Sequence, residues 1–472
     1  MFDLIVISAY FVVMLFVGWR VRRQTPDSYW LAGRKYGTNR ITTSLVATIF
    51  GASSTIGIVG LGYTQGLTGA WWAMMGGLAL IPLGLFLAAR VRTQRVVTLP
   101  DILRNAYGPR VALIGGVVIA VAWCGVVAAQ FVAGGRIIAV LFGVEFQWTL
   151  IAVAVVCICY TFLGGQLSVI KTDRWQFGLL IGSVFLLLSF LLFGGDQQAL
   201  SWASLPAGAL DFPVSEKFGW YELLVFYPLI VGLPYLTGPD IYSRVLSARS
   251  DKAARRATLL AAGVVVPLAL LLAFLGVLIA TRFPLLPAED ALPHALQTLM
   301  PSGLRGLVAA GFLAAIMSSA DSCLISAATI FSRNVVDPAS KKSAERQLYI
   351  TRAAVIGLGL VAGGIALMQR GIIPSLLLGY TIFVGGLAVP TLASFWRKRL
   401  GITSSAGFWA VTAGGASAIL GKVNDGIAIK ALLTESGMEI LATILGPKAL
   451  SILPLFLSAF VLITVSRLSR RH

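Results

Sequence analysis

The chain has 472 residues, of which 57% are hydrophobic and 12% are charged, whereas a soluble domain carries about 25% charged residues. This composition excludes an ordinary soluble protein, and the four cysteines and two histidines exclude a histidine-ligated metal or haem centre. The net charge of +18 would suit a nucleic-acid-binding protein, but most basic residues stand between long apolar stretches, so they indicate membrane orientation instead.

Apolar stretches of about 20 residues, the length that crosses a bilayer core, recur from one end of the chain to the other. They predict an all-α integral membrane protein with about thirteen transmembrane helices. The expected spans, in chain order, are residues 2–19, 41–64, 70–89, 112–142, 147–163, 175–195, 219–238, 258–281, 306–332, 350–369, 373–395, 402–421 and 449–466.

The distribution of basic residues predicts a multi-pass protein of the plasma (inner) membrane, with the N-terminus outside and the C-terminus cytoplasmic. The segment that follows span 219–238 and contains Arg244 is then expected to face the cytoplasm. The expected partners are membrane lipid and a small-molecule substrate, with no nucleic acid and no obligatory protein partner. A short amphipathic helix is expected at about residues 427–441.

Two of the spans contain residues that interrupt a helix. Span 41–64 holds Phe50-Gly51-Ala52-Ser53-Ser54-Thr55-Ile56-Gly57, and span 219–238 holds several prolines and glycines, ending in Gly238-Pro239. Proline removes a backbone donor and clashes with the preceding turn, so the second span must kink or break. Paired interrupted helices in corresponding positions point to the binding site of a transporter built from inverted repeats.

A serine cluster lies far downstream, in span 306–332. Ala315, Ser318 and Ser319 stand at positions i, i+3 and i+4, so they share one helical face. Carbonyls freed by the break in span 41–64, together with these hydroxyls, would form a set of neutral oxygens that suits a sodium ion. The alternative is that both hydroxyls only bond the backbone one turn earlier.

Six short motifs follow one another along the chain: Tyr29–Arg34, Thr98–Asp101, Ala133–Arg136, Gly164-Gly165 with Thr172-Asp173 and Gln176, Gly232–Tyr235 with Arg244, and Ala315–Ser322. Taken in order, they resemble those of the sodium/solute symporter family, and the third and fifth look most like the sodium/proline permease branch. The resemblance implies the leucine-transporter-type fold, in which two inverted five-helix repeats follow one extra N-terminal helix and precede two extra C-terminal helices. It also implies a single membrane transporter domain.

On this resemblance, residues 1–40 form the extra N-terminal helix and loop, 41–195 the first repeat, 219–397 the second repeat and 398–472 the extra C-terminal helices. By position, the sodium site is implied to use the backbone carbonyls of Ala52, Thr55 and Ala315 and the hydroxyls of Ser318 and Ser319.

A second sodium site is implied at Asp173 with Ser318 and Ser322. The alternative for Asp173 is an ion pair with the flanking Lys171 and Arg174 at the cytoplasmic mouth. Either Asp173 or Asp321 would also allow proton coupling in place of sodium, because an ionisable group inside a span is expected to be functional.

The substrate pocket is expected between the two broken helices and span 112–142. Its small, hydroxyl and aromatic residues suit a small organic solute such as an amino acid or carboxylate. Ser54 and Val231 replace an acidic residue and a tryptophan of the proline permease, which argues against proline. Arg136 would either attract a carboxylate or extend to the membrane interface. The expected substrate-binding residues are Ser53, Ser54, Trp123, Gln130 and Tyr235.

The sequence thus predicts a sodium-coupled secondary active symporter that works by alternating access. Sodium is the expected coupling ion and only metal, with no organic cofactor. No HExxH or Gly-x-Ser-x-Gly motif occurs, so an enzyme is not expected. The alternatives left open are a transporter-like membrane sensor without turnover and a proton-coupled symporter.

Overall fold

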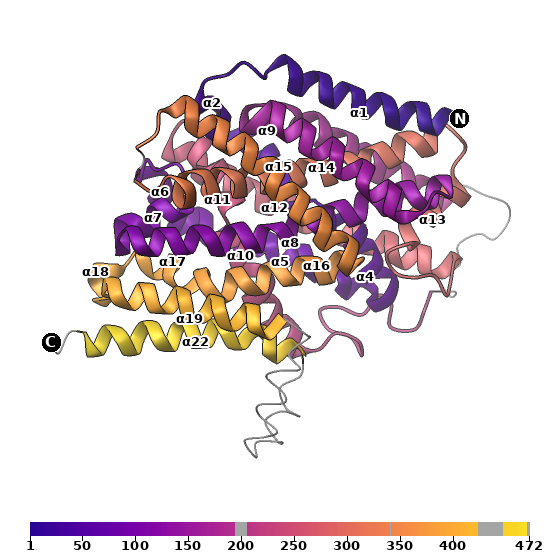
Figure 1. The fold of residues 1–472 in the computed structure, drawn as a ribbon. Helices are drawn as coiled ribbons and strands as arrows, with labels where there is room; N and C mark the ends of the chain where they lie inside the picture. Colours follow the sequence, from indigo (N-terminus) through magenta and orange to yellow (C-terminus); the bar gives the residue numbers. More distant parts are fainter. Residues whose placement is uncertain (194–204, 340, 423–446, 470–472) are drawn as a thin grey trace.

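The computed structural model describes residues 1–193, 205–339, 341–422 and 447–469, and all regular elements in these ranges are helices. The long helices run side by side, and helix α1 begins at the opposite end of the bundle from the end of α22 (Figure 1). Both the start of α13 and α4 lie near the N-terminal end, whereas α7 and α18 lie near the other end. The expected amphipathic helix at 427–441 lies outside the described residues.

In the described ranges, ten helical stretches are long and apolar enough to cross a membrane. Two of these, Ser53–Thr93 and Phe146–Phe193, have 41 and 48 residues, which is enough for two crossings each at about 1.5 Å per residue. The expected number of thirteen helices stays a prediction.

The helices, in chain order, are α1 (Phe2–Arg20), α2 (Pro26–Leu31), η1 (Ala32–Arg34), α3 (Thr38–Ile49), η2 (Ser53–Gly57), α4 (Ile58–Gln65), η3 (Gly66–Ala70), α5 (Trp71–Pro82), η4 (Leu83–Leu87), α6 (Ala88–Thr93), α7 (Leu99–Tyr107), α8 (Pro109–Phe142), α9 (Phe146–Phe193), η6 (Glu222–Phe226), η7 (Pro228–Gly232), α10 (Leu233–Thr237), α11 (Pro239–Ser247), α12 (Asp251–Arg282), α13 (Ala291–Leu299), α14 (Leu304–Ile330), η8 (Phe331–Val336), α15 (Ala344–Gln369), α16 (Ile372–Phe383), η9 (Val384–Ala388), α17 (Val389–Ser394), α18 (Arg397–Leu400), α19 (Ser404–Lys422) and α22 (Pro447–Leu468).

The predicted interruption of the first broken helix is confirmed. Helix α3 ends at Ile49, and Phe50 leaves helical geometry with φ −81° and ψ 61°. The chain becomes helical again through one π-helical turn, η2, before α4 continues the span. Three residues, Phe50 to Ala52, therefore separate two half-helices inside one span.

The second interruption lies at Gly238, where the backbone is extended with φ −64° and ψ 143°. Pro239 then opens α11, because proline suits the first turn of a helix, where its missing N–H is not needed. The span therefore does not end at residue 238, as expected, but continues to Ser247. As a consequence Arg244, expected on the cytoplasmic side, is fully buried.

The segment expected to be a loop around residues 164–174 is helical and belongs to α9. Only Gly165 departs from the helix, with a positive φ of 57°, and a side chain there would collide with the ring of Tyr29. Asp173 is fully buried, whereas Lys171 and Arg174 are exposed. The structure therefore places Asp173 away from these two basic side chains, and the expected ion pair is wrong.

Helix α14 forms the centre of the bundle. The most apolar 18-residue window of the stretch Leu304–Val336 is buried along its whole length, whereas the corresponding window of α1 is mostly exposed. Helix α14 packs against α3, α8 and α9. The serine cluster is thus held where the first broken helix passes the core of the protein.

Candidate functional site

Ser319 faces the interruption between α3 and η2. Its hydroxyl donates to the carbonyl oxygen of Thr48 at 2.6 Å. A Cβ atom added to Gly51 would lie 2.5 Å from the Ser319 hydroxyl oxygen, so this glycine lets α14 approach the break. The backbone N–H of Ala52 donates to Gln130 Oε1 at 2.7 Å, which satisfies one donor that the break frees.

The carbonyl oxygens around the break are partly used within the chain. The Ala52 carbonyl accepts the N–H of Gly57 at 2.9 Å, and the Gly51 carbonyl accepts the hydroxyl of Thr55 at 2.7 Å. The Ala52 carbonyl also accepts longer contacts from the Thr55 N–H at 3.4 Å and the Thr55 hydroxyl at 3.5 Å, so a cation there would compete with these donors. Ala315 is buried in α14, one turn before Ser319.

Ser318 connects the serine cluster to Asp173. Its hydroxyl donates to Asp173 Oδ1 at 2.7 Å, and the hydroxyl of Ser44 donates to the other carboxylate oxygen. The Ser318 hydroxyl proton therefore points at Asp173, and the lone pairs of the Ser318 oxygen remain available to a cation. The negative charge of Asp173 lies one hydrogen bond behind that oxygen and would attract the cation electrostatically.

The implied second sodium position contains a guanidinium group. Ser322 donates its hydroxyl proton to the Ser318 carbonyl at 2.6 Å and accepts a hydrogen bond from Arg244. Arg244 also donates to the Ser243 hydroxyl at 2.9 Å. A sodium ion could use Ser322 only after Arg244 had moved away.

Asp321 does not join this cluster. One of its oxygens accepts the hydroxyl of Thr161 on α9 at 2.7 Å, and the other has no hydrogen-bond partner among the described residues. The carboxyl is only 1% exposed. Like Ser318, three residues earlier, it lies on the side of α14 that faces α9, but it binds Thr161 rather than Asp173.

Four of the five expected substrate residues line one small central cavity. Ser53, Trp123, Gln130 and Tyr235 contribute to its wall, and its volume is about 20 Å³. Such a space holds one or two water molecules and is too small for an organic solute. Ser54 is buried but does not line the cavity, and its hydroxyl has no partner among the described residues.

Among the lining residues that sequence reasoning missed are the acidic Asp240 and the aromatic Tyr380. Asp240 begins the half-helix after the second break, and the Gly238-Pro239 pair had suggested that the span ended there. Tyr380 lies on α16, and its ring meets the ring of Tyr235 edge to face at a centroid distance of 6.3 Å. An acidic residue directly after an interrupted helix was the available signal for Asp240.

Arg136 pairs with acidic side chains of the protein itself, and its two expected roles stay predictions. It forms ion pairs of 2.9 Å with Glu289 and with Asp290, which precede α13, and it donates to the carbonyl of Arg370. Glu289 also accepts the N–H of Ile372 at 2.7 Å. Burial raises the pKa of Glu289 above its ordinary 4.5. We call these residues the α13 clasp, and they join α8, α13 and α16 near the end where α1 begins.

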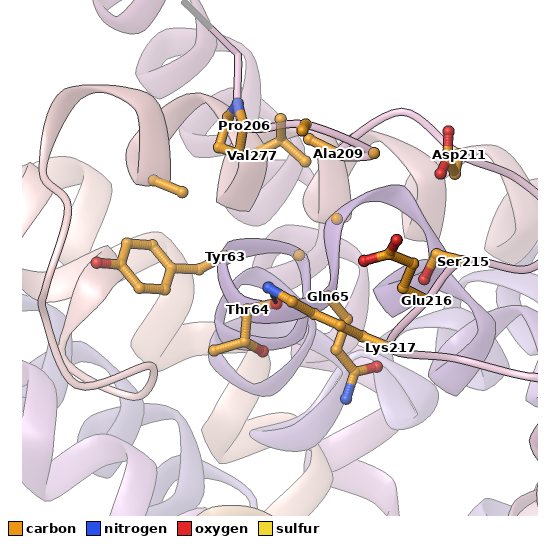
Figure 2. A pocket seen from close by; sticks show the side chains of 15 residues that line it. Tyr63, Thr64, Gln65, Pro206, Ala209, Asp211, Ser215, Glu216, Lys217 and Val277 are labelled. Atoms are coloured by element: carbon orange, nitrogen blue, oxygen red, sulfur yellow. Dashed lines mark hydrogen bonds between the residues drawn. The ribbon is translucent and has the colours of Figure 1, made fainter.

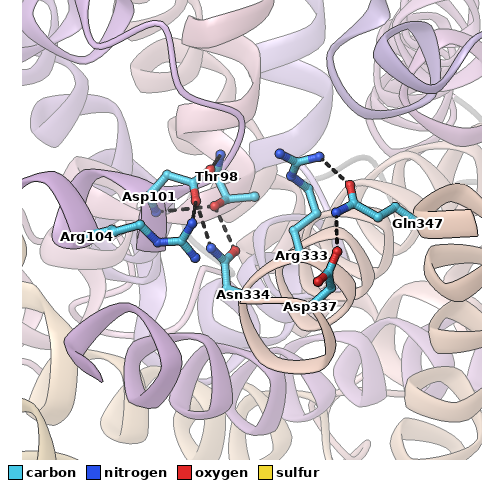
Figure 3. Close-up of polar contacts among 7 residues, drawn as sticks. All are labelled: Thr98, Asp101, Arg104, Arg333, Asn334, Asp337 and Gln347. Carbon is cyan, nitrogen blue, oxygen red and sulfur yellow. Dashed lines mark hydrogen bonds and ion pairs between the residues drawn. The ribbon is translucent and has the colours of Figure 1, made fainter. Parts of the chain in front are cut away.

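A second polar network joins α7, η8 and α15 near the other end of the bundle (Figure 3). The Thr98 hydroxyl caps α7 and donates to Asn334 Oδ1 at 2.8 Å, while the Asn334 amide donates to Asp101. Gln347 donates to Asp337 at 2.7 Å. Burial would raise the pKa of Asp337, but this bond and two backbone N–H groups hold it below its ordinary value. We call this the α7 network.

A larger pocket of about 180 Å³ opens where α4 ends (Figure 2). It is lined by polar residues of a loop, and Lys217 in it donates to the carbonyl of Thr64 at 2.8 Å. None of the expected sodium or substrate residues lines it. This pocket is therefore separate from the central cavity.

Known proteins resemble this chain in sequence and in fold. The model of the family described as "Sodium:solute symporter family" matches residues 29–400. The chain is 26% identical to the sodium/glucose cotransporter of Vibrio parahaemolyticus, over 84% of this chain and 81% of that protein. It is 28% identical to sodium/myo-inositol cotransporter 2 of Rattus norvegicus and 26% identical to high-affinity choline transporter 1 of Drosophila melanogaster. Each of these two matches covers 76% of this chain, which spans about 60% of the two longer relatives.

Two solved structures share the fold. One is a Na+-coupled sialic acid symporter in a substrate-bound outward-open state, with a TM-score of 0.77 and 18% identity over 99% of this chain and 98% of that one. The other is the nucleobase-cation-symport-1 family transporter MHP1, with a TM-score of 0.59 and 14% identity over 93% and 94%. The expected leucine-transporter-type fold is confirmed.

Proposed function

The chain belongs to the sodium:solute symporter family, and we propose that it couples the movement of a small organic solute to sodium by alternating access. The family consists of transporters rather than enzymes. The observation that carries the proposal is the contact between the first helix break and the hydroxyl of Ser319 on α14. Neutral oxygens from two separate helices meet at this point, as a sodium site requires.

In the proposed site, sodium is held by the carbonyls of Ala52, Thr55 and Ala315 and by the hydroxyls of Ser318 and Ser319. The hydrogen bonds of Ser318 and Ser319 support this assignment, because both hydroxyls point their protons at acceptors and keep lone pairs free. Sodium there would join α14 to the first broken helix. It would favour whichever state brings these elements together, through its higher affinity for that state.

We propose one sodium ion per cycle in the arrangement that the structure describes. A second ion at Asp173, Ser318 and Ser322 belongs to the proposal only for a state in which Arg244 has left Ser322, because two cations would otherwise share one hydroxyl. Proton coupling stays a separate possibility, tested by uptake at varied pH without sodium.

The solute is proposed to bind in the central cavity, against Ser53, Trp123, Gln130 and Tyr235. Named relatives carry glucose, myo-inositol and choline, so kinship leaves the solute class of this chain open. The types of the expected residues suit a small molecule such as an amino acid, and the cavity of about 20 Å³ would have to widen to admit it. The proposed location is the plasma membrane, with the N-terminus outside, the C-terminus cytoplasmic, lipid around the bundle and no obligatory protein partner.

The experiment measures uptake of labelled solutes into proteoliposomes that contain the purified chain. It compares an inward sodium gradient with a buffer in which potassium replaces sodium and from which choline is absent. We expect uptake that requires sodium and that the double variant Ser318→Ala/Ser319→Ala abolishes. The matched control is Ser326→Ala, on the same helix, whose hydroxyl has no partner among the described residues. Sodium-independent uptake that survives the double variant would refute the proposal, and binding without flux would favour a sensor.

A further inference from the structure

The central cavity carries one charged side chain among the described residues that line it, the carboxylate of Asp240. Asp240 is 8% exposed and stands at the start of α11, directly after the second helix break. No salt bridge formed by the described residues includes it. A carboxylate in such a position needs a positive partner, because burying an unpaired charge is costly.

Arg244 lies one turn further along α11 and balances the Asp240 charge only in part, because the two side chains form no salt bridge. Its guanidinium donates to the hydroxyls of Ser322 and Ser243, and it reaches only the backbone carbonyl of Asp240, at 3.4 Å. The same guanidinium interacts electrostatically with both Asp173 and Asp240. Its single charge is therefore shared between two carboxylates and cannot neutralise both.

The charges of the core do not balance. Three acidic residues, Asp173, Asp240 and Asp321, are buried there, and Arg244 is the one basic residue buried with them among the described residues. If all three acids are ionised, the core lacks two positive charges. The proposed sodium ion supplies one of these, which leaves room for a second cation beside Asp240.

Aromatic rings surround the carboxylate. Trp123, Tyr235 and Tyr380 line the same cavity, and Trp123 packs against Phe383 at a centroid distance of 4.8 Å. The faces of such rings attract organic cations, most strongly where water is excluded.

We propose that the transported solute carries a positively charged amine or ammonium group, for which Asp240 is the counter-ion and the three rings form the wall. The inference rests on the proposed function and narrows its substrate class. An amino acid satisfies it through its ammonium group. A carboxylate without an amine does not, because Asp240 carries charge of the same sign.

The first experiment is a thermal-shift screen of the purified full chain in sodium buffer. The panel consists of small solutes that differ in charge: 1-amino-2-propanol and choline as cations, alanine and proline as zwitterions, lactate and pyruvate as anions, and myo-inositol and glycerol as neutral solutes. We expect stabilisation only by members that carry a cationic nitrogen. A panel in which no amine stabilises the protein overturns the inference.

The second experiment measures affinity for the strongest amine in variants. Asp240→Asn should weaken it about ten- to a hundredfold, as loss of a charged hydrogen-bond partner does, while the affinity for sodium stays within about twofold. Asp321→Asn is the matched control, since it changes a buried aspartate that does not line the cavity. Unchanged amine affinity in folded Asp240→Asn protein would contradict the assignment.

Substitutions of Tyr380 test the inference independently if the Asp240→Asn variant fails to fold. Tyr380→Phe retains the ring and should bind the amine within about twofold, whereas Tyr380→Leu should lose roughly fivefold or more. Equal affinity in both variants would overturn the aromatic part. Sodium-driven uptake of a neutral solute would support the proposed function and refute this inference. Amine binding without sodium-dependent flux would support this inference and refute the proposed function.

Discussion

The two interrupted helices present different chemistry to the core. The break after Ile49 is surrounded by neutral oxygens, from backbone carbonyls and from Ser319, and its nearest acid, Asp173, lies behind Ser318. The break at Gly238 is followed directly by a carboxylate, Asp240. Neutral dipoles can replace the water around a small hard cation, whereas a carboxylate and aromatic rings suit a bulky organic cation. The two breaks thus divide the ligands between them.

The two sites nevertheless share part of their walls. Gln130 accepts the N–H of Ala52 at the first break and also lines the central cavity, and Ser319 lines that cavity as well. A ligand bound at one break is therefore linked to the other break through the side chains of Gln130 and Ser319. This arrangement explains how sodium at the first break could raise the affinity for a solute at the second.

The largest expected effect comes from closing the first break with a methyl group. Gly51→Ala would place Cβ 2.5 Å from Ser319 Oγ and 2.7 Å from Gln130 Oε1. We expect sodium-driven uptake to fall more than tenfold and stability to fall by about 1–3 kcal/mol, as overpacking does. Gly263→Ala on α12 is the control, because a Cβ there meets no atom within 4 Å. Normal uptake by folded Gly51→Ala protein would show that the close approach is dispensable.

The next effect should separate the two breaks. Ser319→Ala should raise the sodium concentration for half-maximal uptake about tenfold, because one ligand and one hydrogen bond to Thr48 are lost. Asp240→Asn should instead raise the half-saturating solute concentration with little change for sodium. Initial uptake rates over a grid of sodium and solute concentrations measure both. If each variant shifted both constants equally, the proposed division of ligands would be wrong.

A smaller effect should come from the residue that the two sites share. Gln130→Leu keeps side-chain bulk but leaves the N–H of Ala52 without its acceptor, at a cost of about 1–3 kcal/mol. We expect both half-saturating concentrations to rise about threefold, and sodium to lose most of its influence on solute affinity. Binding titrations with and without sodium measure that influence. Persistence of the full sodium effect would exclude Gln130 as the link.

The sequence predicted the first break and its partners better than the second. Gly51 and the hydroxyl residues around it stand inside an apolar stretch, where they have no reason to occur in a continuous helix. Asp240 and Arg244 were assigned to a cytoplasmic segment, because Gly238-Pro239 resembles a helix end and polar residues follow it.

The partners that make burial of Arg244 possible come from distant parts of the chain. Ser322 and Gln166 each lie 78 residues away from it, so only the folded structure brings them together. Arg136 gives the same lesson, since its partner Asp290 lies 154 residues away, a pairing that no local pattern reveals. Local pattern shows where a helix breaks, whereas long-range contacts decide which charges are buried beside the break.

The smallest expected effect concerns the α13 clasp, which lies outside both breaks. Burial raises the pKa of Glu289 above 4.5, so the closed clasp binds a proton more readily than an open one, in which Glu289 would titrate normally. Acid should therefore stabilise the closed clasp as the pH falls from the raised pKa toward 4.5, although the ion pair with Arg136 weakens. Hydrogen exchange of α13, corrected for intrinsic rates, should slow roughly two- to threefold over this window. Glu289→Gln should abolish that pH dependence, whereas Glu216→Gln, in the loop pocket, should keep it. Faster exchange in acid would mean that the ion pair outweighs burial, and the clasp would then open rather than close as protons accumulate.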